Sequence, residues 1–175
     1  MIKVGIPHSL FYFYYYPLWK TFFEELGAQV VRSHPTSRLT VDQGVRLAVD
    51  EACFPIKVYF GHVKELADRG VDYLFVPRLV SVEPKSYICP KFMGLPDMIR
   101  ACISHLPPLI DITVDVSKTD KFLHKDIIRV GRIFGASSKS IRAAYQKGLQ
   151  ELRFCRALAT QGLTPQEAIR VWEGD

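Results

Sequence analysis

Two of the four cysteines stand where a thiol could bind a metal. Cys53 directly precedes a predicted helix, whose unpaired backbone amides and positive pole favour the thiolate form. Cys89 stands before Pro90 in a similar loop position. Thiolates bind zinc or iron–sulfur clusters. The alternative is that both are small buried hydrophobic residues, the commonest role of free cysteine, and their spacing does not decide between the two readings.

Basic side chains accompany these cysteines. Lys57, Arg78 and Lys91 could neutralise the negative charge of a cluster or hold a phosphate group, although basic residues on loops are most often simply solvated. These three residues, together with His8, are the candidates for binding a cofactor or an anionic substrate.

A zinc site is a second possibility for the same thiols, because zinc accepts mixed nitrogen and sulfur ligands. His8, His34 and His62 could complete it, but no CxxC or HxxxH pair supports this. Cys102 and Cys155 lie in phase with apolar helix residues, so we expect them in the core and not among the ligands.

The composition limits the classes of protein to which this chain could belong. A chain of 175 residues with 48% hydrophobic content can form a sizeable core, and its net charge of +5 is spread along the chain. No nucleic-acid motif accompanies the basic residues, and the aromatic run 11–16 lacks interleaved Lys and Arg, so it is predicted to pack around a buried site. With no apolar run of about eighteen residues and no targeting segment, we expect a cytoplasmic protein with reduced thiols.

The apolar patterns predict a doubly wound α/β fold with a mostly parallel four-stranded sheet. Helical patterns begin near Pro17, at Thr40, where Gln43 suggests a capping box, after Cys53 and at Pro96. They alternate with four predicted strands, which cover residues 2–6, 29–33, 73–76 and 109–116. Right-handed crossovers give the strand order 2-1-3-4.

Two regions follow from these patterns. Residues 1–118 form the Rossmann-like domain, and residues 119–175 form an extension of two or three helices broken near Gly135 and Gly162. In open α/β sheets ligands bind beyond the carboxyl ends of the strands, where the strand order reverses. The loops at 7–12, 50–57 and 77–91 should meet there, which would place Cys53 and Cys89 at one edge.

Several motifs, taken in order, closely resemble the acyl-CoA dehydratase activase-related proteins. These proteins are relatives of the cluster-carrying subunits of 2-hydroxyacyl-CoA dehydratases and of double-cubane cluster proteins. The resemblance covers nearly the whole chain and is carried by the segments Gly-Ile-Pro at 5–7, Tyr-Tyr-Tyr-Pro-Leu-Trp-Lys at 14–20, Asp-Glu-Ala-Cys-Phe-Pro-Ile-Lys at 50–57, Tyr-Phe-Gly-His-Val at 59–63, Phe-Val-Pro-Arg at 75–78 and Tyr-Ile-Cys-Pro-Lys-Phe-Met-Gly-Leu-Pro-Asp at 87–97.

The resemblance implies an iron–sulfur redox component of anaerobic metabolism that receives low-potential electrons from an ATP-dependent activase. Cys53 and Cys89 correspond to two cysteines that bind a 4Fe-4S or double-cubane cluster in the family. If the chain is part of an enzyme, that enzyme would be a dehydratase, which is a lyase, or an ATP-dependent reductase. Its active site would be incomplete within this chain.

Two departures from the family pattern matter. His8 stands where family members usually carry Arg, which puts an anion contact at that position in doubt. Members also carry a second α/β domain with a further cysteine, so we expect a second domain or subunit to complete the site and the cluster to be incomplete or absent in the isolated chain.

The alternative function is a non-catalytic module that binds acyl-CoA or a partner protein without metal. We expect neither nucleic-acid nor membrane binding, whereas the apolar stripes of the C-terminal helices favour a partner domain or a homodimer.

Overall fold

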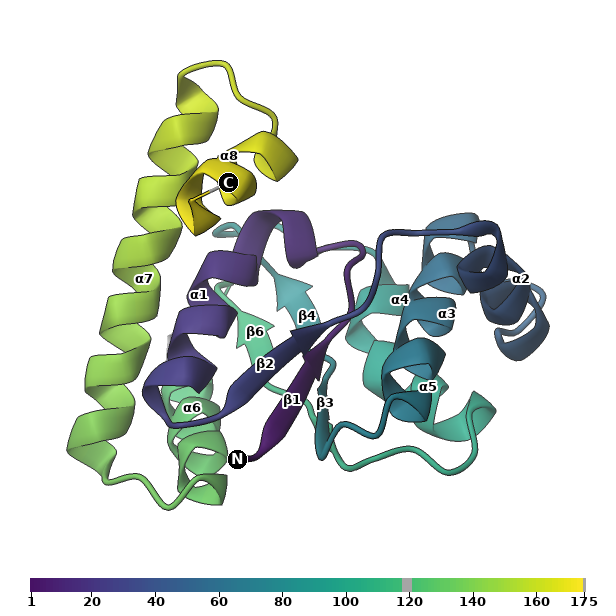
Figure 1. The fold of residues 1–175 in the computed structure, drawn as a ribbon, viewed down its shortest axis with the longest axis horizontal. Helices are drawn as coiled ribbons and strands as arrows, with labels where there is room; N and C mark the ends of the chain where they lie inside the picture. The colour runs from purple at the N-terminus through teal and green to yellow at the C-terminus, as the bar shows by residue number, and fades with distance from the viewer. Residues whose placement is uncertain (118–120, 175) are drawn as a thin grey trace.

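The computed structural model describes residues 1–117 and 121–174, and its centre is a four-stranded parallel sheet (Figure 1). The strands are β1 (Lys3–Ile6), β2 (Gln29–Arg32), β3 (Tyr73–Phe75) and β5 (Leu109–Ile110), in the order β2-β1-β3-β5. The predicted α/β fold and strand order 2-1-3-4 are confirmed. The predicted domain boundary between residues 118 and 119 lies outside the described residues.

The predicted fourth strand is divided, and its second part forms a small parallel sheet that the sequence did not predict. This sheet pairs β4 (Arg78–Ser81) with β6 (Thr113–Asp115). It continues the pairing of β3 with β5, because the N–H groups of Val76 and Arg78 donate to the carbonyl groups of Ile110 and Ile112 over 3.0 and 2.9 Å.

Pro77 does not stop the chain from pairing, contrary to the sequence prediction of a loop from this residue onward. In a parallel ladder alternate residues donate to the same neighbour, and here Val76 and Arg78 are the donors toward Ile110 and Ile112. The missing N–H of Pro77 therefore falls on the opposite side, toward β1, which has already ended at Ile6. The paired strands β4 and β6 thus extend beyond the carboxyl end of β1.

Helices cover both faces of the sheet, each over its own hydrophobic core (Figure 1). Alternate side chains of β3 enter different cores, with Leu74 on one side and Phe75 on the other. The Leu74 side is covered by α2 (Arg38–Leu47), α3 (Phe54–Asp68), α4 (Pro90–Met93) and α5 (Leu95–Cys102), and the Phe75 side by α1 (Tyr12–Glu25), α6 (Lys121–Ile133), α7 (Ser138–Thr160) and α8 (Pro165–Glu173).

Two predicted helix starts are wrong by several residues. Helix α1 begins at Tyr12, and Pro17 lies inside it. The missing N–H of Pro17 leaves the carbonyl of Phe13 without its helical donor, a cost confined to one position near the start of the helix. Helix α2 is capped by Ser37, whose Oγ accepts from the N–H of Thr40, so the capping box lies three residues earlier than the sequence suggested. The single turn of α4 was not predicted.

The C-terminal extension is helical as predicted; the two or three expected segments are three in the described residues, and they pack on the α/β core. Helix α7 lies along α1 (Figure 1), so close that a Cβ on Gly148 would fall 2.5 Å from the carbonyl oxygen of Leu18. Helix α8 is attached at its end by Arg32, whose guanidinium lies 2.6 Å from the carboxylate of Glu173. None of the helices in the described ranges combines the length and hydrophobicity that crossing a membrane requires.

Helices α2 and α3 cross with their backbones in contact. A Cβ on Gly44 would lie 1.9 Å from the carbonyl oxygen of Lys57, and one on Gly61 would lie 1.9 Å from that of Thr40. Only glycine permits such an approach, because no carbon atom can stand so close to backbone oxygen. The crossing fixes the start of α3, and with it Cys53, relative to α2.

We predict that Gly44→Ala lowers the free energy of unfolding by about 2 kcal/mol, despite the gain of about 1 kcal/mol that alanine brings to an exposed helix. Urea unfolding followed by circular dichroism measures this. Gly94→Ala is the matched control, because its Cβ would meet only the carbonyl oxygen of Pro90 at 3.8 Å and its φ of −89° suits alanine. Equal stability of the two variants would show that the helices can separate without loss.

Candidate functional site

A cavity of about 240 Å³ lies at the carboxyl edge of the sheet, between the ends of β1 and β3. Ile6 and Pro7 border it at the end of β1, and Phe75 and Pro77 at the end of β3. This is the point at which the strand order reverses, where open α/β sheets bind their ligands. The position predicted for the site therefore holds a cavity.

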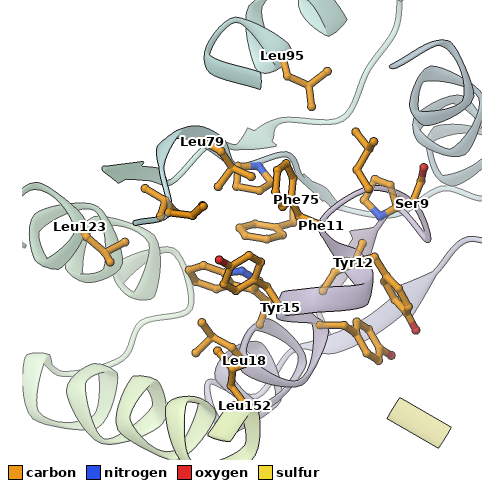
Figure 2. A pocket seen from close by; sticks show the side chains of 18 of the residues that line it. Ser9, Phe11, Tyr12, Tyr15, Leu18, Phe75, Leu79, Leu95, Leu123 and Leu152 are labelled. Carbon is orange, nitrogen blue, oxygen red and sulfur yellow. The ribbon is translucent and has the colours of Figure 1, made fainter. Parts of the chain in front are cut away.

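The walls of the cavity are almost entirely apolar (Figure 2). Leu79 and Leu95 lie on one side, and Tyr15, Leu18 and Leu152 on the other (Figure 2). The β4–β6 pair also contributes Val114 and, in the chain that follows each strand, Val82 and Val116. These wall residues come from segments far apart in the sequence.

The aromatic run 11–16 supplies much of one wall, as the sequence predicted. Phe11, Tyr12, Tyr15 and Tyr16 line the cavity. Burial raises the pKa of both Tyr12 and Tyr16, and it raises that of Tyr59 on the facing helix α3. These phenols therefore stay protonated at neutral pH and serve as neutral, largely apolar surface.

Among the described residues that line the cavity, one is a cation. The guanidinium of Arg156, an exposed residue of α7, lies 5.5 Å from the centre of the Tyr15 ring. This distance allows a cation–π contact. In the described part of the chain no carboxylate forms an ion pair with Arg156.

Cys53 and Cys89 are both exposed and directly precede helices α3 and α4. Helix α3 ends near the amino edge, where the backbone of Asp72 is hydrogen-bonded to Lys3 at the start of β1. Its beginning, with Cys53, must then lie toward the carboxyl edge, and Cys89 follows β4 on that side. The fold places both cysteines at this edge, although neither is among the residues that line the cavity.

The loops that carry the two cysteines touch. The ammonium group of Lys91, two residues after Cys89, donates to the carbonyl oxygen of Glu51, two residues before Cys53. Phe92 also packs on the cavity wall, with its ring centre 4.9 Å from that of Phe11. The α3 and α4 starts are thus held side by side next to the cavity.

The charge of Arg78 is paired, and its contacts hold neighbouring elements in place. Its guanidinium donates to the carbonyl oxygen of Met93 and lies 2.8 Å from the carboxylate of Asp97, which ties β4 to α4 and α5. Lys57 is half-buried in the first turn of α3. Of the predicted basic residues, Lys91 and Arg78 therefore shape the loop around Cys89, and their binding of an anion remains a prediction.

Cys102 and Cys155 lie in the hydrophobic packing. Cys155 is buried in the core between α1 and α7, where burial raises the pKa of its thiol. Cys102 is half-buried against the other core, at the end of α5. Among the described residues there is no group of three or more His, Cys, Asp and Glu side chains that could hold a metal ion.

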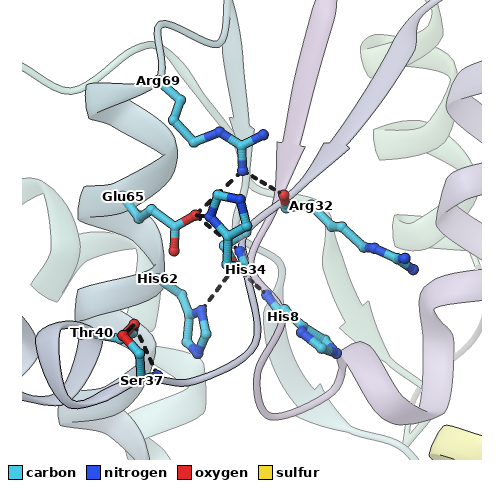
Figure 3. Close-up of polar contacts among 9 residues, drawn as sticks. His8, Arg32, His34, Ser37, Thr40, His62, Glu65 and Arg69 are labelled. Carbon is cyan, nitrogen blue, oxygen red and sulfur yellow. Dashed lines mark hydrogen bonds and ion pairs between the residues drawn. The ribbon is translucent and has the colours of Figure 1, made fainter.

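Three of the five histidines, His8, His34 and His62, lie on the β2 side of β1, among polar side chains (Figure 3). His62, fully buried on α3, has Ser33 Oγ 2.9 Å from Nδ1 and Thr36 Oγ1 2.9 Å from Nε2. Because Ser33 Oγ accepts from the backbone N–H of His8 over 2.8 Å, its hydrogen is available to His62 Nδ1. His34 lies apart, on the carboxylate of Glu65 at 2.7 Å (Figure 3).

His8 lies beside these polar side chains and is not among the residues that line the cavity. Its ring centre is 4.3 Å from that of Tyr12 and 6.4 Å from that of His62, and Nδ1 has no hydrogen-bond partner among the described residues. Burial and the neighbouring Arg32 lower its pKa. The Ser33–His62–Thr36 network was not predicted from the sequence, although a histidine among Tyr59, Phe60 and Val63 could have signalled a buried position.

The fold and this edge define a doubly wound α/β protein whose ligand side is the carboxyl end of the sheet. The chain belongs to the family described as CoA enzyme activase uncharacterised domain (DUF2229), whose profile matches residues 3–171. The match spans nearly all of the chain and confirms the relationship to CoA-enzyme activases. No curated protein and no solved structure matches the chain.

We predict that His62 makes stability depend on pH. Burial lowers its pKa from 6.5 to about 4 in the folded protein, so the ring stays neutral there while the unfolded chain takes up a proton below pH 6.5. Its contribution to stability is complete above pH 6.5 and declines as the pH falls toward 4, by up to about 1.4 kcal/mol per pH unit. Urea unfolding at a series of pH values, compared with His62→Gln, measures this slope, and identical slopes would contradict it.

The two exposed thiols should be close enough for one bifunctional reagent to bridge. We predict that a trivalent arsenical, which binds two neighbouring thiols, adds once per chain at Cys53 and Cys89, as counted by mass spectrometry under reducing conditions. Cys53→Ser and Cys89→Ser should each abolish the adduct, whereas Cys102→Ser should retain it. An adduct that survives both serine variants would mean that the two thiols do not converge.

Proposed function

We propose that this chain supplies two thiolate ligands, from Cys53 and Cys89, to an iron–sulfur cluster that accepts low-potential electrons from an ATP-dependent activase. The observation that carries this proposal is the pairing of two exposed cysteines at the starts of α3 and α4, on loops joined by the Lys91–Glu51 hydrogen bond. Membership in the CoA enzyme activase family supports the link to an activase.

The donor set fits half of such a cluster. Thiolate is the ligand that iron–sulfur clusters require, and a 4Fe-4S cluster takes four of them. This edge offers two, while the core position of Cys155 and the packed position of Cys102 remove them from it. Such a cluster would store and pass on single electrons. The remaining ligands must then come from a second domain or subunit.

The exposure of the two thiols agrees with a shared site. A site completed by this chain alone would be expected to enclose its ligands, whereas these cysteines face outward, toward whatever covers the edge. The unpaired N–H groups of the first turn of α3 carry partial positive charge beside a cluster bound at Cys53. Lys57 and Lys91 add positive charge beside the two thiols, which offsets the charge of a thiolate-bound cluster.

A metal-free module that binds acyl-CoA or a partner is the second candidate. The observation that favours it is the apolar cavity next to the cysteines, which could hold an acyl group without any metal. In that case Cys53 and Cys89 could be replaced by serine with no loss of binding. The two candidates therefore differ in what the thiols do.

We predict that the chain alone binds iron poorly after anaerobic reconstitution with ferrous iron and sulfide, because half of the ligands of a four-iron cluster are missing. Iron and sulfide assays should give well below four irons per chain. The little cluster that forms should require both Cys53 and Cys89 and run with the dimer in size-exclusion chromatography.

Matched variants make this result interpretable. Cys102→Ser and Cys155→Ser should keep the iron content of the unmodified chain, whereas Cys53→Ser and Cys89→Ser should abolish it. About four irons per monomer would refute the half-site, and bound iron that persists in the Cys53→Ser, Cys89→Ser double variant would refute the assignment of the ligands.

A further inference from the structure

The cavity at the carboxyl edge is too large to be a packing defect. Protein interiors are packed about as densely as organic crystals, and the few voids in a domain are small. An engineered cavity of about 150 Å³ already binds benzene, and this one has about 240 Å³. A cavity of this size with apolar walls and access from solvent has the properties of a binding site for an apolar group.

The opening of the cavity to solvent is bordered by residues that are only partly buried. Leu149 on α7, Leu123 on α6 and Val114 on β6 line the cavity and are each half-buried, so the space between these elements opens to solvent. Trp19 and Leu79, which are almost inaccessible to solvent, form the deeper part of the wall. The cavity is therefore an apolar pocket with a mouth rather than a sealed void.

In the part of the chain that the structure describes, the mouth carries one positive charge. Arg156 lines the cavity, is exposed, and rests on the Tyr15 ring, while no carboxylate in the described part of the chain neutralises it. Most of the other arginines at the two sheet edges are paired, for example Arg78 with Asp97 and Arg32 with Glu173. An unpaired guanidinium at the rim of an apolar pocket suits a ligand with an apolar body and a single anionic end.

We propose that this pocket binds the unbranched acyl chain of a fatty acid, with its carboxylate at Arg156. An engineered cavity of about 150 Å³ holds benzene, which has six carbons, so by comparison a volume of about 240 Å³ is enough for a chain of roughly eight carbons. The ligand is thus a medium-chain acid of about eight carbons, or the first eight carbons of a longer chain whose remainder projects into solvent.

This inference does not depend on the iron–sulfur proposal, because neither Cys53 nor Cys89 lines the pocket. The two can succeed or fail separately. Binding of the acid should be the same in the Cys53→Ser, Cys89→Ser double variant as in the unmodified chain, with no iron present.

Isothermal titration of the unmodified chain with fatty acids of increasing length tests the pocket. Each methylene contributes about 0.8 kcal/mol when it is buried, so affinity should rise about fourfold per carbon from butanoate to octanoate and then level off. The fluorescence of Trp19, which lines the pocket, should change with the same concentration dependence. Octanol, which has the same chain without the charge, should bind at least about tenfold more weakly than octanoate.

Two variants separate the chain from the head group. Arg156→Gln should weaken octanoate at least about tenfold and leave octanol unchanged, whereas Arg153→Gln, the same change at an exposed position of α7 outside the pocket, should affect neither. Val114→Phe should fill the pocket and weaken octanoate and octanol alike, with its fold checked by circular dichroism.

Three results would overturn the proposal. They are an affinity that does not vary with chain length, an equal effect of the Arg156 and Arg153 substitutions on octanoate, and binding of octanoyl-CoA without binding of octanoate. The last result would place the recognised anion on the nucleotide, and not at Arg156.

Discussion

The candidate site depends on the unequal lengths of neighbouring strands. The pairing of β3 with β5 continues past Pro77 into β4 and β6, whereas β1 between β2 and β3 ends at Ile6. Helix α1 contacts β2 of the main sheet, and its residues line the same pocket as Leu79 and Val114 of the projecting β4–β6 pair. The apolar pocket lies in the angle between them, and the loops of Cys53 and Cys89 lie along its side.

The strand order and the edge that carries both cysteines could be predicted from the sequence, because buried strands and capped helices leave strong local signals. The β4–β6 pair could not. Its residues resemble a loop because Pro77 and the charged residues after it break the apolar pattern. Whether the missing N–H of Pro77 prevents pairing depends on which neighbouring strand it faces, and that cannot be seen in the sequence. The start of α1 was also hidden, because proline is usual in the first turn of a helix, whereas Pro17 lies inside α1, which begins at Tyr12.

The lining of the pocket is equally invisible to local patterns. Leu149, Leu152 and Arg156 lie on α7, more than a hundred residues from the aromatic run that they face. Their helical spacing predicts an apolar face, but what that face covers follows only from the packing of α7 along α1. The sequence could thus indicate the thiols and the aromatic wall, while the opposite wall and the position of Arg156 on it required the fold.

The glycine contact between α2 and α3 bears on how tightly anything can bind at Cys53. Because Gly44 touches the backbone of Lys57, the segment between the two helices is anchored at both ends. Its chain entropy is therefore already lost on folding, and little remains to be lost when a ligand arrives. The Cys53 thiol is in this sense preorganised. Mutations at the crossing of α2 and α3 should therefore weaken the binding of a ligand at Cys53, although they do not contact that ligand.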